Sequence, residues 1–233
     1  MVAESLPLFP LGTVLFPGVL MPLHVFEQRY RKLVRALLTG EAENQWFGVV
    51  AIRQGWEVGA DAARALHRVG CSAELRQVNR HPDGRYDILA VGRRRFQLLG
   101  VDAASRPYLV GTVEWLPDDD AVAPVDGPSA MQAQTLADAV STAFTDYLGA
   151  VAAARGLRGQ PQPMPENPTA LCHLVASAAL LTLDDRQALL EQPSTVGRLQ
   201  DTLSLLRRET AMLRMLRVVP APLSELPKPT ELN

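Results

Sequence analysis

The first forty residues of the chain change their hydrophobic period near His24. Between Leu6 and Leu23 apolar residues run almost without a break, but four prolines fix φ and remove backbone donors. A continuous helix is therefore excluded in this stretch. We expect short buried strand-like runs at residues 14–16 and 19–21, separated by turns.

From His24 onward the apolar spacing becomes helical. One stripe carries Phe26, Tyr30 and Leu33, while charged residues occupy the opposite face. The pattern predicts an amphipathic helix that buries this stripe and ends at Gly40.

The next segments are dense in β-forming residues. A strand is predicted at residues 46–52, in a central position, and a half-exposed strand lies within residues 66–78. The Pro-Asp-Gly sequence at residues 82–84 predicts a hairpin turn between that strand and later runs at residues 86–91 and 95–101. A last strand is expected at residues 108–115.

The second half of the chain has helical periodicity. Ser129 is the expected N-cap of a helix that ends near Gly156, and Asn167 followed by Pro168 predicts another helix start, for a helix through residue 181. A short helix follows at residues 183–191, and a final one carries a leucine stripe with arginines, Arg198 among them, largely away from it.

These patterns predict four consecutive units. They are a β-rich domain (1–116), an acidic, proline-rich linker (117–128), a helical domain (129–219) and a flexible tail (220–233). From periodicity alone, the first domain is β-rich with one helix.

Composition narrows the possible functions. The chain is 47% hydrophobic and 21% charged, with a net charge of −2, which excludes general disorder and the strongly basic field of a dedicated nucleic-acid binder. Its two cysteines, Cys71 and Cys172, are far apart and lack metal-ligand spacing, so we expect neither a disulfide framework nor a metal site. Because neither a signal peptide nor a membrane span is indicated, we expect a cytoplasmic location.

The amino-terminal stretch LPLFPLGTVLFPGVLMPLHVFEQRYRKLV resembles the opening of the Lon substrate-binding domain family, which runs approximately LPLFPL, LFPG, PLHIFE and RY. Similar residues continue through the β-rich half and the later helices, so the resemblance covers approximately residues 6–218. It implies an α+β fold: a bent, PUA-like β-structure with one packed helix, followed by a carboxy-terminal helical bundle.

Complete Lon proteases add an ATPase module and a Ser/Lys protease module. This sequence has no phosphate-binding loop of the G-x-x-x-x-G-K-[ST] type, and its only lysines are Lys32 and Lys228. We therefore expect no enzymatic activity, no catalytic residues and no cofactor.

Several polar residues are of types that take part in catalysis or binding, but we expect them to have structural roles. His24, a lone histidine at the start of the first helix, lacks an orienting carboxylate in the sequence pattern. Glu27 and Arg29 are expected to tie helix to sheet. The triplet at residues 93–95 could contact phosphate, but Arg94 would face away from its two neighbours on a strand.

The preferred hypothesis is a non-catalytic binding protein that engages unfolded or exposed peptide segments in protein quality control, alone or with a protease or chaperone. The alternative is a PUA-like module that binds RNA or a small ligand. We call the protein or peptide that is bound the client. Apolar groups flanked by turns or polar residues are suited to anchor such a partner. On this ground the candidate residues for contact with the client are Leu20, Met21, Trp46 and Trp56. For the two tryptophans we favour the alternative that they simply cover the rim of the β-core.

Overall fold

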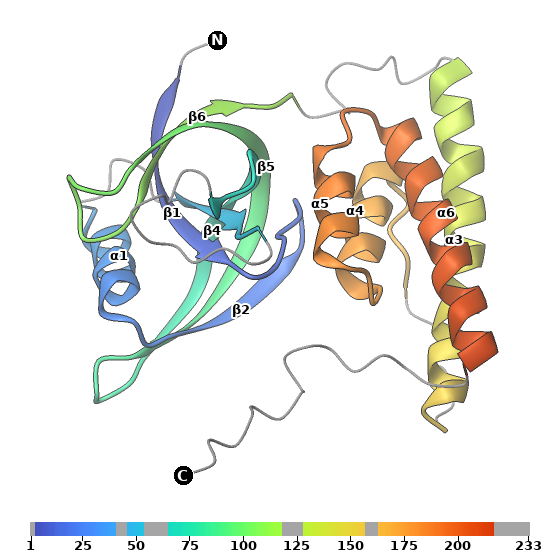
Figure 1. Ribbon diagram of the computed structural model, residues 1–233, viewed down its shortest axis with the longest axis horizontal. Coiled ribbons are helices and arrows are strands. Elements are labelled where there is room, and N and C mark those ends of the chain that lie inside the picture. The colour runs from blue at the N-terminus through green and yellow to red at the C-terminus, as the bar shows by residue number, and fades with distance from the viewer. Residues whose placement is uncertain (1–2, 41–45, 54–64, 118–127, 157–162, 217–233) are drawn as a thin grey trace.

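The computed structural model describes residues 3–40, 46–53, 65–117, 128–156 and 163–216, and its strands precede most of its helices (Figure 1). The first half contains β1 (Glu4–Leu11), β2 (Leu20–Val25), α1 (Gln28–Thr39), β3 (Trp46–Ala51), β4 (Val69–Arg80), β5 (Tyr86–Asp102) and β6 (Val110–Trp115). The second half contains α3 (Pro128–Ala154), α4 (Pro168–Ala178), α5 (Leu183–Glu191) and α6 (Thr195–Leu216).

The strands form one strongly bent sheet in the order β2-β5-β4-β3-β1-β6, with β5 also pairing to β6. Strand β5 makes this closure possible because it is one long, curved strand: its first half pairs with β2 and its second half with β6. Register shifts in its pairings with β4 and β6 accompany the curvature, as β-bulges do. The runs predicted at residues 86–91 and 95–101 are therefore parts of a single strand.

The first strand differs from the prediction. Residues 14–16 are buried but lie outside the strands, whereas β1 comes earlier and includes Pro7 and Pro10. Its first half pairs antiparallel with β6, and its second half pairs parallel with β3. Because β1 changes partner along its length, two residues without backbone donors can be accommodated.

Helix α1 packs against the sheet on the side opposite α3–α6 (Figure 1). Tyr30 stacks on Phe9 of β1 with ring centroids 4.1 Å apart, and Leu33 is fully buried in the same cluster. The helix ends at Gly40, which has φ of 74°, as the sequence predicts.

The helical half follows some of its sequence signals and departs from others. Asn167 Oδ1 accepts a hydrogen bond from the backbone N–H of Ala170 at 2.8 Å, which confirms it as the N-cap of α4. That helix ends at Ala178 rather than at residue 181. Ser129 is not a cap, because α3 already begins at Pro128.

Helix α5 faces the sheet, and the two halves share a buried cluster. Phe16 and Val69 pack with Leu189 and Leu190, and Gln187 donates through Nε2 to the Val69 carbonyl at 2.9 Å. The core therefore continues from the strands into the helices.

Two buried arginines hold the end of α5. Arg95 of β5 donates to the carbonyls of Leu190 and Gln192 at 3.0 and 2.9 Å. Arg198 of α6 donates to the Leu189 carbonyl at 3.0 Å and also to Gln192. Arg198 is 0% exposed, so the prediction that places it away from the packed face is wrong.

The α+β class, with a bent sheet, a packed first helix and a helical second half, is confirmed. The boundaries of the four predicted units stay a prediction, and most of the linker and all of the tail lie outside the described residues. No helix in the described part of the chain is long and apolar enough to cross a membrane.

Candidate functional site

Strand β2 forms one end of the sheet and, within the described residues, pairs only with β5. Its side chains alternate, so that Leu20, Pro22 and His24 point outward while Val25 is buried. The alternation continues one residue beyond the strand to Phe26. Leu20 is 57% exposed and Phe26 is 62% exposed, so this edge presents two large apolar side chains. We call Leu20, Pro22, His24 and Phe26 the β2 outer face.

The prediction that Phe26 belongs to the core stripe of the first helix is wrong. Helix α1 begins only at Gln28, and Phe26 lies in the connection from β2. Its position therefore follows the two-residue period of β2, which turns Val25 inward and Phe26 outward. That period was the sequence signal for its exposure.

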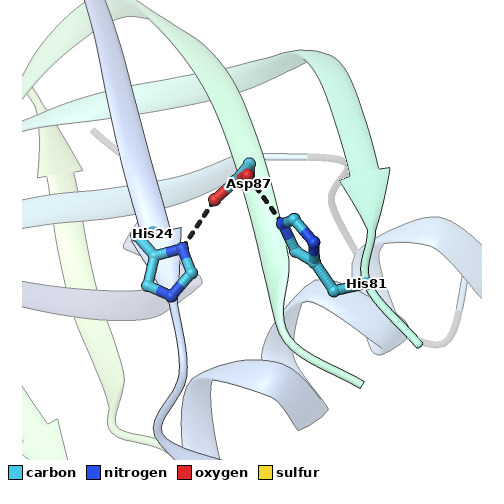
Figure 2. A group of neighbouring side chains, drawn as sticks. All are labelled: His24, His81 and Asp87. Carbon is cyan, nitrogen blue, oxygen red and sulfur yellow. Dashed lines mark hydrogen bonds and ion pairs between the residues drawn. The ribbon is translucent and has the colours of Figure 1, made fainter. Parts of the chain in front are cut away.

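A polar cluster adjoins the β2 outer face. Asp87 lies directly opposite His24 in the β2–β5 register, and His81 stands at the turn between β4 and β5. Figure 2 shows the two imidazoles on either side of the carboxylate. His24 Nδ1 lies 2.6 Å from Asp87 Oδ1, and His81 Nε2 lies 2.6 Å from Asp87 Oδ2. The hydrogen bonds from His24 and His81 lower the pKa of Asp87.

This cluster corrects the view of His24 as a histidine without a carboxylate partner. His24 and Asp87 are 63 residues apart in the chain, and only the pairing of β2 with β5 brings them together. His81 directly precedes the predicted turn at residues 82–84, and this place was a signal that it could face the start of β5.

The four candidate client contacts do not form one surface. Leu20 is exposed, but Met21 on the same strand packs against the core beneath α1. Trp46 starts β3, which β5 and β4 separate from β2 in sheet order, and makes an edge contact with Trp115. Trp56 lies outside the described residues. Their role in binding stays a prediction.

The arginine triplet makes no common basic surface. Arg93 pairs with Glu74, the Arg94 guanidinium lies over the Trp115 ring at 5.0 Å, and Arg95 is buried at the end of α5. Each member already has a protein partner, which weakens the case for a phosphate-binding role.

The expected tie between helix and sheet is made by a different residue. Arg29 pairs with Glu27 at 2.7 Å, within the start of the helix. Arg31 instead donates to the Asp83 carbonyl at 3.2 Å and so links α1 to the β4–β5 turn.

A second histidine environment lies at the junction of strands and helices. His173 of α4 is 5% exposed and lies beside Phe16. Burial, together with the positive charges of Arg198 and Arg95, lowers the pKa of His173 to about 3. His173 is therefore neutral at physiological pH and belongs to the core rather than to a reactive site.

The helical half carries a shallow hollow of about 410 Å³ between α3 and α6. Its lining mixes alanine and threonine with charged residues such as Asp146 and Arg207. It lacks the large exposed apolar groups of the β2 outer face.

Comparison with known proteins places this arrangement in a family. The model of the ATP-dependent protease La (LON) substrate-binding domain matches residues 5–208. Lon protease 1 of Thermus thermophilus is 30% identical over 224 residues, which are 95% of this chain and 27% of that protein. Lon protease 2 of Syntrophobacter fumaroxidans is 27% identical, over 91% of this chain and 25% of its own length. The chain thus spans approximately a quarter of these curated relatives.

Solved structures agree with the fold. A Lon N-terminal domain protein from Xanthomonas campestris aligns with a TM-score of 0.59 at 26% identity, covering 86% of this chain and 98% of that one. The N-terminal domain of a Mycobacterium avium complex Lon protease aligns with a TM-score of 0.62 at 19% identity, covering 89% of this chain and 98% of its own.

Proposed function

Because the chain belongs to the Lon substrate-binding domain family, we propose that it binds unfolded or exposed peptide segments and performs no catalysis itself. The observation that carries this proposal is the β2 outer face, where Leu20 and Phe26 stand exposed beside a strand that ends the sheet. A role in protein quality control, with a protease or chaperone as partner and in the cytoplasm, follows from the same kinship.

An end strand with alternating apolar side chains suits extended clients. A peptide that adds to the edge of a sheet gains main-chain hydrogen bonds that do not depend on its sequence. Leu20 and Phe26 would then contact apolar side chains of the client, and Pro22 would restrict the register because it has no backbone donor. The expected specificity is for apolar content rather than for a defined motif.

The absence of catalysis rests on what the chain resembles and on its sequence. The family model that it matches is a substrate-binding domain, and no phosphate-binding loop occurs among its 233 residues. The purified protein should neither hydrolyse ATP nor cleave casein. ATP turnover that follows the protein peak through several chromatographic steps would contradict this.

Client binding can be measured by fluorescence anisotropy with a labelled, permanently unfolded casein. Leu20→Ser combined with Phe26→Ser should weaken binding at least about tenfold, because interface anchors of this kind each contribute on the order of 1–2 kcal/mol. Leu38→Ser combined with Leu99→Ser is the matched control, since these leucines are 55% and 56% exposed elsewhere. Equal affinities of the two double variants would move the binding surface away from β2.

The RNA-binding alternative has a separate test. The protein is used to pull down its partners from cell extract, with and without ribonuclease treatment, and the captured protein and RNA are both measured. Because the members of the arginine triplet are engaged by protein groups, we expect the captured proteins to persist after ribonuclease treatment. Loss of all captured material would favour the RNA-binding module.

A further inference from the structure

Of the cluster of His24, His81 and Asp87, only His24 belongs to the β2 outer face. Together the three side chains form a ligand set that has no role in the proposed contacts with a peptide. One ligand atom from each residue lies within 4.8 Å of the other two. Two imidazole nitrogens and one carboxylate are the donors that zinc and similar divalent ions take from proteins.

The backbone fixes these three residues in place. His24 and Asp87 are register partners on neighbouring strands, so the distance between their Cα atoms is set by the sheet. His81 is held at the turn, where its N–H donates to the Arg85 carbonyl at 2.9 Å and its carbonyl accepts from Gly84 at 2.9 Å. The ligands therefore converge without needing a metal to assemble them, which reduces the ordering cost of binding.

The ligand atoms are near one another but not yet at the separations found around a coordinated ion. Zinc binds nitrogen and oxygen ligands at about 2.0–2.2 Å, so two ligands on one tetrahedral ion are separated by about 3.3–3.5 Å. In the structure each imidazole nitrogen lies 2.6 Å from a carboxylate oxygen, with a hydrogen bond between them. Small side-chain rotations would open these contacts to coordination distances, and the half-exposed side chains of His24 and Asp87 have room for them.

We propose that His24, His81 and Asp87 bind one divalent transition-metal ion, zinc by preference, at the corner where β2 meets the β4–β5 turn. The ion takes the place of the hydrogen bonds between the imidazoles and the carboxylate, each neutral imidazole carries its single proton on the ring nitrogen that does not bind the ion, and the remaining coordination positions face solvent. This proposal does not rest on peptide binding, because it needs only the three ligands.

The neighbouring charges are compatible with a cation. Arg85 is paired with Asp83 at 2.6 Å, and Arg31 donates to the Asp83 carbonyl. The Phe26 ring lies beside His24, with centroids 6.2 Å apart. The metal would add a direct link between β2, the β4–β5 turn and the start of β5.

The test uses the full chain without an affinity tag, freed of metal by a chelator and titrated with zinc against a chromophoric competitor. We expect one zinc ion per chain, with affinity that falls at least about tenfold in His81→Gln and in Asp87→Asn. His67→Gln is the matched control, because His67 lies outside the cluster, near Glu191. Cobalt should give the absorption of a site with nitrogen and oxygen ligands, lost in the same two variants.

Thermal unfolding shows that each variant is folded and adds a second readout. Zinc should raise the melting temperature of the natural chain and of His67→Gln, and should leave His81→Gln and Asp87→Asn unchanged. The proposal is overturned if the natural chain binds no zinc at micromolar free metal. It is equally overturned if stoichiometric binding persists in both cluster variants.

Discussion

The bent sheet has two margins of opposite character. Where it meets α5, large side chains and even the guanidinium groups of Arg95 and Arg198 are buried, and backbone carbonyls satisfy them. Along the β2 outer face, Leu20 and Phe26 remain exposed beside a polar cluster. The first margin has the chemistry of a permanent interior, whereas the second has apolar groups that only a partner would cover. Substitutions where the sheet meets α5 should therefore change the stability of the fold, whereas substitutions on the β2 outer face should change binding to a partner.

The largest loss of stability is expected from a substitution at the α5 margin, where the sheet meets α5. Arg95→Ala removes the donors to three carbonyls, those of Leu190, Gln192 and Pro117, and should lower the free energy of unfolding by about 4 kcal/mol. Urea unfolding measures this change. Its control is Arg93→Ala, which removes only a partly exposed pair with Glu74 and should cost less than about 1 kcal/mol. Equal losses in the free energy of unfolding of the two variants would contradict the proposed difference between the two margins of the sheet.

The same margin should be sensitive to acid. Because burial lowers the pKa of His173 to about 3, while the unfolded chain binds the proton near its ordinary value of 6.5, the unfolded state binds more protons between these values. The stabilising contribution is complete above pH 6.5 and is lost as the pH falls toward 3. Between pH 7 and pH 4 the loss should be about 3 kcal/mol.

The acid effect is measured by urea unfolding at a series of pH values. His173→Gln has no titrating ring, so its free energy of unfolding should fall less steeply over this range than that of the natural chain. Parallel pH profiles would show that His173 does not remain neutral in the folded protein.

A much smaller change in stability is expected at the β2 outer face. Phe26→Ala should change the free energy of unfolding by less than about 1 kcal/mol, because the side chain is already 62% exposed. Tyr30→Ala, four residues later, should cost about 3–5 kcal/mol, because its ring is buried against Phe9. A large loss in Phe26→Ala would show that this ring is part of the core after all.

The smallest change is expected in the hydrodynamic size of the protein after proteolytic cleavage between its two halves. We predict that a protease cleaves within residues 117–128, because acidic and proline-rich composition is typical of a linker. The shared core of Phe16 and Val69 with Leu189 should keep the fragments together, so the hydrodynamic size should hardly change. Cleavage that starts within β3 would contradict the predicted boundaries, and separation of the fragments would contradict the shared core.

Local signals in the sequence were sufficient where one residue decides the structure. The Gly40 end of α1 and the Asn167 cap of α4 each depend on a single backbone requirement. The turn at residues 81–85 is similarly local. These features could be predicted without knowing what surrounds them.

The remaining features depend on contacts between distant segments. Phe26 stands where the period of β2 passes into that of α1, and only the true start of the helix decides which period it follows. Arg198 looks like a surface residue until the end of α5 supplies carbonyls for it. The meeting of His24 with Asp87 needs a strand register, which no short motif encodes.

The position of β1 also has a consequence for the order in which the chain can fold. Its partner β6 lies more than a hundred residues later in the chain. Glu4 therefore cannot pair with Val113 until that residue has been synthesised. During synthesis the β4–β5 hairpin can form from neighbouring residues, while the amino-terminal strand stays without that partner until Trp115 has left the ribosome. Loop closure on this scale slows folding, and closure of the sheet by β1 should be among the last events in this half of the protein.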